Sequence, residues 1–127
     1  MSLQDWPELV EPMRDELRTM EWEGQVITAF TPHSDHFPFV VAGLPAAMIG
    51  SAGWPGVQGA IHNTADTPEK VSAMRLQGTA AVLARLAIRV SCDEEWPAQR
   101  RTPEEVAERL TALGLEPEMR LENHWPF

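Results

Sequence analysis

The spacing of apolar residues along the chain predicts three longer helices. The first covers residues 7–20, where apolar positions recur every three or four residues between charged ones. The second begins at Thr67, a favourable N-cap that is followed by proline, and it runs to about Cys92. The third has Thr102 as the N-cap of a capping box and ends near Gly114.

Two short runs of β-forming residues lie between the first two helices. Residues 25–30 and 44–51 are bounded by glycine or proline and predict strands. A short helix over residues 37–42 separates them and ends at Gly43, and a glycine-rich loop over residues 50–59 follows. These elements predict an α/β fold. Two strands are few for an open sheet that carries helices on both faces, so we expect further polypeptide to complete it.

Composition and charge are typical of an ordinary globular domain and argue against two kinds of partner. The 127 residues match one domain, and 43% of them are hydrophobic. The formal net charge of −9 disfavours nucleic acid and anionic membranes, because both attract Lys and Arg. The longest apolar run is interrupted by proline and glycine, which disfavours a membrane span. With one cysteine, Cys92, the chain can form no internal disulfide, and we expect a cytoplasmic protein.

The residues that could carry chemistry are concentrated in predicted loops. His33, His36 and His62 fall within thirty residues of one another, accompanied by Asp35 and Asp66. Open α/β sheets bind ligands at strand ends, and imidazole and carboxylate groups are zinc ligands, so the set is compatible with a metal site. The same residues also suit simpler roles, Asp35 as a helix N-cap and His36 as a hydrogen-bonding loop residue.

Two segments carry short motifs in a fixed order. Residues 34–46 contain Ser-Asp-His-Phe-Pro-Phe followed by Ala-Gly-Leu-Pro-Ala, and residues 62–67 are His-Asn-Thr-Ala-Asp-Thr. These segments resemble the Ser-Asp-His-x-x-Phe and Ala-Gly-(Ile/Val)-Pro-Ala motifs and the His-Thr-x-x-Asp-Thr element of the di-zinc aminopeptidases, metallopeptidase family twenty-eight. The resemblance covers about residues 26–90, and the tail is similar to the C-terminal extension of some bacterial members.

The resemblance implies a partial three-layer α/β/α zinc-peptidase-like fold with few strands and about four helices. We expect a single domain with three consecutive parts: an N-terminal helix in residues 1–24, the motif-bearing core in residues 25–92 and a helical extension in residues 93–127. From residue 115 onward we expect an irregular tail that ends in Trp-Pro-Phe.

The resemblance also implies roles for single residues. The family's final zinc ligand falls on His62, and Asp66 and Thr67 would fix the loop that aims it. Complete members hold two zinc ions, which activate water to hydrolyse the N-terminal peptide bond of a peptide substrate. The family's Ser-Asp-His segment lines the active-site cleft without binding zinc, which implies a position beside the metals or the substrate for Ser34, Asp35 and His36.

Several positions depart from the family pattern. Ile61 stands where many members have a tyrosine whose hydroxyl stabilises the tetrahedral intermediate, and isoleucine can donate no hydrogen bond. His33 stands where a substrate-contacting arginine is common. The bridging aspartate, the first histidine, the Glu-Glu pair and the general base belong to an N-terminal half that has no counterpart among these residues. We therefore expect the C-terminal segment of a zinc-dependent aminopeptidase, with zinc absent or its site incomplete, and no activity alone.

Three interpretations remain open at this point. The segment can be completed by the missing N-terminal half or by a homo-oligomer, through an open edge of the sheet. It can instead be a non-catalytic interaction or oligomerisation module derived from the peptidase fold. The third is a mononuclear metal site built from His33 or His36 together with Asp35 and His62.

Overall fold

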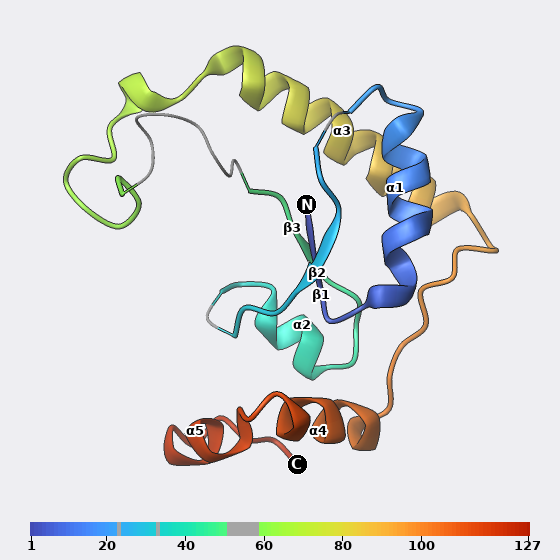
Figure 1. Ribbon diagram of the computed structural model, residues 1–127, viewed down its shortest axis with the longest axis vertical. Helices are drawn as coiled ribbons and strands as arrows, with labels where there is room; N and C mark the ends of the chain where they lie inside the picture. Colours follow the sequence, from blue (N-terminus) through green and yellow to red (C-terminus); the bar gives the residue numbers. More distant parts are fainter. Residues whose placement is uncertain (23, 33, 51–58) are drawn as a thin grey trace.

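A small mixed sheet lies at the centre of the computed structural model, which describes residues 1–22, 24–32, 34–50 and 59–127 (Figure 1). Its order is β2–β1–β3, with bounds Ser2–Gln4 for β1, Ile27–Ala29 for β2 and Ala47–Met48 for β3. β1 pairs in parallel with β2 and antiparallel with β3. The combination of this sheet with surrounding helices confirms the α/β class.

The central strand β1 is absent from the elements that the sequence predicts. Both predicted strands are present in shorter form, and β1 lies between them, so that Leu3 faces Thr28 on one side and Ala47 on the other. Leu3 is 2% exposed, and the fully buried Gln4 accepts a hydrogen bond from the backbone of Thr31 at 2.9 Å. A strand of three residues is too short to show an alternating pattern, which is why the sequence does not reveal it.

Helices surround the sheet at the positions that the apolar spacing predicts, with one addition near the C-terminus. A 3₁₀ turn, η1 Pro7–Leu9, leads into the first α-helix, and a second, η2 Pro68–Lys70, precedes the longest one. The α-helices are α1 Val10–Arg18, α2 Phe37–Val41, α3 Ala73–Cys92, α4 Pro103–Ala112 and α5 Glu116–Leu121. No helix among the described residues is long and apolar enough to cross a membrane.

Two predictions about the helices are wrong and one is confirmed. The tail contains α5 where an irregular segment is expected, and acidic residues in its first turn favour the helix. α3 begins after Ser72, whose hydroxyl accepts a hydrogen bond from Arg75 N, because Thr67 leads only into η2. The capping box of α4 is formed as predicted, with Thr102 Oγ1 3.2 Å from Glu105 N.

Two clusters of buried side chains hold these elements together. Phe30 and Phe37 contact both clusters, and their rings meet edge to face with 5.9 Å between centroids. The smaller cluster joins α4 and α5 through Val106, Leu110 and Met119. The larger cluster lies among the sheet, α1, α2 and α3, and its buried members are Leu3, Trp6, Leu9, Met13, Leu17, Val26, Val40 and Leu86.

Asp5 links the N-terminal strand to α4 by charge. It is 9% exposed, and its carboxylate accepts hydrogen bonds from Arg109 Nε at 2.7 Å and from Arg101 Nη1 at 3.2 Å. The Arg101 guanidinium also lies 4.0 Å from the centroid of the Trp6 ring. Burial raises the pKa of Asp5, but the hydrogen bonds and charges of Arg109 and Arg101 together outweigh it, so this pKa lies below its ordinary value.

The end of α2 requires a glycine, as the sequence predicts. Gly43 has a φ of 77°, in the left-handed region where a Cβ is unfavourable. Its carbonyl oxygen accepts a hydrogen bond from Arg101 N at 2.9 Å, which joins the end of α2 to the segment before α4. A Cβ at this position would lie 2.2 Å from the Arg101 carbonyl oxygen, so only glycine permits this approach.

Candidate functional site

His62 lies on an exposed turn that its neighbours hold in place. Its φ of 62° is one that a residue other than glycine rarely adopts. The Asn63 side-chain oxygen accepts a hydrogen bond from Ala65 N at 2.8 Å, and its amide nitrogen donates to the Gly59 carbonyl oxygen. Asp66 N donates to the Asn63 carbonyl oxygen at 3.1 Å. The turn thus fixes the backbone at His62 and leaves the residue exposed to solvent.

The neighbours that shape this turn differ in part from those that the motif suggests. Asp66 contributes its backbone N–H, while Thr67 precedes η2 and lowers the pKa of Glu69 through a side-chain hydrogen bond. Lys70 Nζ donates to a backbone carbonyl oxygen of the turn, and Asn63 supplies the side-chain bonds described above. Asparagine favours such turns, because its side chain bonds the backbone two residues further on. The asparagine that follows His62 is therefore the sequence feature that indicates this role.

The Ser-Asp-His segment forms the start of α2. The Ser34 carbonyl oxygen accepts a hydrogen bond from Phe37 N at 2.9 Å, and His36 occupies the N-cap position. No side-chain hydrogen bond caps this helix, so Asp35, which is exposed, is not the N-cap that the sequence suggests. The His36 ring donates from Nε2 to the Thr31 carbonyl oxygen at 2.9 Å.

The Nδ1 atom of His36 is buried and has no hydrogen-bond partner within the described part of the chain. His33, the residue at the family's arginine position, lies outside the described residues. The segment therefore offers one buried imidazole nitrogen, from His36, and an exposed carboxylate, from Asp35.

The two motif segments do not come together as one metal centre. Figure 1 places the turn at residues 59–66 well apart from α2. Within the described ranges, no three His, Cys, Asp or Glu side chains gather closely enough to hold a metal ion. Zinc in proteins takes three or four protein donors, so His62 by itself does not fit a resident ion. A mononuclear site of His36, Asp35 and His62 is therefore not formed.

A pocket of about 490 Å³ lies between the Ser-Asp-His segment and α5. Most of its lining residues are apolar, and two glutamates and a histidine are also among them. A mostly apolar lining that includes carboxylates suits an apolar group that carries a positive charge. The residues that line the pocket are Pro32, Ser34, Phe37, Pro38, Val41, Leu115, Glu118, Met119, Glu122 and His124.

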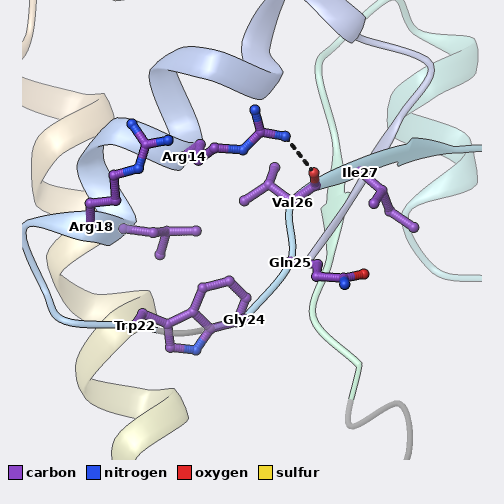
Figure 2. Close-up of a pocket in the computed structure, with 8 residues that line it drawn as sticks. Arg14, Arg18, Trp22, Gly24, Gln25, Val26 and Ile27 are labelled. Atoms are coloured by element: carbon purple, nitrogen blue, oxygen red, sulfur yellow. Dashed lines mark hydrogen bonds between the residues drawn. The ribbon is translucent and has the colours of Figure 1, made fainter.

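A second pocket, of about 460 Å³, opens between α1 and the chain that enters β2, and Figure 2 shows its lining residues. Arg14 donates to the Val26 carbonyl oxygen at 3.2 Å, and both Arg14 and Arg18 are paired with acidic residues of α1. The Trp22 ring lies so close to Gly24 that a Cβ there would be 2.1 Å from it. The arginines therefore serve local structure, and none of the motif residues lines this pocket.

Comparison with known proteins leaves the family open. No family model matches the chain, and no curated protein and no solved structure matches it either. The resemblance to the di-zinc aminopeptidases thus depends on the order and spacing of the two motif segments and on the helix that follows them.

Proposed function

We propose that this chain is the C-terminal segment of a zinc-dependent aminopeptidase. In this proposal His62 is a zinc ligand whose partner ligands come from an N-terminal half, and the chain has no activity alone. The observation that supports it best is the combination of an exposed imidazole with a turn fixed by hydrogen bonds from Asn63. A ligand that must meet donors from another part of a protein needs both features.

Among the described residues, His62 belongs to no group of three metal-binding side chains, which agrees with this division of labour. The two-zinc site and the general base would belong to the complete enzyme, which would hydrolyse the N-terminal peptide bond of a peptide. Residues of this chain would aim the ligand and line the cleft, and the Ser-Asp-His segment would face the substrate side. Ile61, which is 71% exposed, would leave that cleft without the hydroxyl that many family members carry.

Zinc binding and turnover by the purified chain test this proposal together. We expect no hydrolysis of leucine-p-nitroanilide in added zinc, and at most weak zinc binding, seen by calorimetry, that is lost in His62→Ala. His124→Ala is the matched control, because His124 is 70% exposed and lies on the C-terminal tail. Hydrolysis by the chain alone, with about two zinc ions held tightly, would contradict the proposal.

A second candidate function is an interaction or oligomerisation module. It is favoured by α3, in which Leu86 is the single buried residue among twenty that are all described. A complete enzyme that keeps its zinc content and turnover in His62→Ala would favour this second function, because the module needs no metal ligand.

A further inference from the structure

The exposed side of α3 carries no charge, although solvent-facing helix surfaces are normally rich in charged residues. The three charged residues of this helix are arginines, and two of them bond residues at the C-terminal part of α1. Arg85 donates to Thr19 Oγ1 at 2.8 Å, and Arg89 Nε lies 3.2 Å from Glu16 Oε2. Arg75 lines a hollow together with Arg85, on the same side. The remaining surface of the helix is therefore apolar or uncharged and open to solvent.

Within this surface, six residues form a straight seam along the helix axis. The distances between them in sequence are three, four, three, four and three residues, the spacing of a and d positions in a coiled coil. All six are exposed, with exposed fractions of 61% for Leu76, 48% for Leu83 and 41% for Val90. The seam consists of Ala73, Leu76, Ala80, Leu83, Ala87 and Val90.

The order of large and small residues makes the seam complementary to itself when two copies run in opposite directions. With a two-fold axis midway between Ala80 and Leu83, each alanine lies opposite a larger residue. The pairs across the axis are Ala80 with Leu83, Ala87 with Leu76, and Ala73 with Val90. In a parallel pair, alanine would instead face alanine and leucine would face leucine. Alternation of large and small residues across facing positions is what lets two layers interdigitate.

We propose that α3 pairs antiparallel with α3 of a second copy of this chain, about a two-fold axis between Ala80 and Leu83. Such a contact is isologous and closes as a dimer. The antiparallel arrangement also sets the helix dipoles in opposite directions, and the uncharged flanks of the seam create no like-charge repulsion. This inference does not depend on the peptidase proposal, because it uses no motif residue.

The length of the seam sets the expected strength of the dimer. A helix of 20 residues is roughly 30 Å long, and one helix pair of this length buries an area at the small end of specific interfaces. We therefore expect a reversible dimer with a dissociation constant in the micromolar range.

Sedimentation equilibrium over a range of micromolar concentrations tests the dimer. We expect the mass of the wild type to approach twice the monomer mass of 14.2 kDa. Leu83→Glu places a carboxylate in the seam of each copy and should weaken the dimer more than tenfold, to a monomer. Leu121→Glu is the control, because Leu121 is 87% exposed on α5, and it should dimerise as the wild type does. A monomeric wild type, or a dimer that Leu83→Glu leaves unchanged, would overturn the proposal.

Disulfide cross-linking tests the direction of the pair, in a Cys92→Ser background that removes the exposed native thiol. An equal mixture of Ala73→Cys and Val90→Cys proteins should give mixed cross-linked dimers on mild oxidation. Neither variant should link to itself, because residues 73 of two antiparallel copies are about 25 Å apart at 1.5 Å per residue. Self-linked Ala73→Cys dimers without mixed ones would show a parallel pair and refute the proposed geometry.

Discussion

Replacing Asp5 by asparagine removes the negative charge that links β1 to the C-terminal helices while it preserves the shape of the side chain. Asp5 has a φ of 63°, a region that asparagine tolerates well, so the substitution adds little backbone strain. The carboxylate now accepts hydrogen bonds from Arg101, which is 17% exposed, and from Arg109, which is 49% exposed. An amide oxygen in the place of Oδ2 can still accept from both arginines, but the amide NH2 would replace the acceptor of Arg109 Nη2, and the amide attracts neither arginine by charge.

The loss in the free energy of unfolding follows from how exposed Arg101 and Arg109 are. A hydrogen bond to a charged group contributes about 1.5–3 kcal/mol, and the Arg101 contact is sufficiently buried to fall in that range. The Arg109 contact is half exposed, so water screens it and it contributes less. Part of the bonding survives through the asparagine oxygen. We therefore expect Asp5→Asn to lower the free energy of unfolding by about 2 kcal/mol at neutral pH.

The lowered pKa of Asp5 determines how the difference in stability between wild type and Asp5→Asn changes with pH. The folded-state pKa of Asp5 lies below its value in the unfolded chain, so its contribution is complete above about pH 4 and is lost as the pH falls through the folded-state value. Urea unfolding followed by tryptophan fluorescence should therefore show wild type and Asp5→Asn converging in acid. A difference that is the same at every pH, or below about 0.5 kcal/mol at neutral pH, would refute the reasoning.

A matched control lies on α1. Asp15 pairs with Arg18 at 2.6 Å, but both side chains are about two-thirds exposed, at 67% and 65%. Exposed pairs contribute little, so Asp15→Asn should change the free energy of unfolding by less than about 0.5 kcal/mol. If Asp15→Asn lost as much stability as Asp5→Asn, the loss in both variants would come from the change in net charge and not from the buried contact.

Two further substitutions test how the helices end and begin, each by urea unfolding. Gly43→Ala should destabilise the fold by more than about 2 kcal/mol, because it combines a left-handed backbone with a Cβ 2.2 Å from the Arg101 carbonyl oxygen; an unchanged midpoint would contradict that contact. Thr102→Ala should cost about 1 kcal/mol through loss of the capping box, and Thr102→Ser should restore most of it. Equal stability of the alanine and serine variants would contradict the capping role.

The sequence predicts most helices because their signals are local. The capping box at Thr102, the apolar spacing of α1 and the glycine after α2 each depend on neighbours within a few residues. β1 depends instead on partner strands that begin well over twenty positions later in the chain, Ile27–Ala29 and Ala47–Met48. The link from Asp5 to Arg109 joins residues about a hundred positions apart. A single sequence carries no local pattern for such contacts.

The candidate site is predictable only in part for the same reason. The motif marks His62, and the structure places it on a turn whose shape depends on Asn63. Spacing in the sequence says nothing of the distance between this turn and α2, which Figure 1 shows to be large. The residues of the α3 seam recur at heptad spacing in the sequence, but only the structure shows that α1 covers a different side of that helix.

The zinc content of this chain joined to the N-terminal half that the proposal requires tests the central claim most directly. We predict about two zinc ions in the wild type and in His124→Ala, and about one in His62→Ala, because the ligand of one ion would be removed. Equal zinc content in His62→Ala and the wild type would contradict the assignment of His62 as a zinc ligand, and with it the proposal that this chain completes a peptidase site.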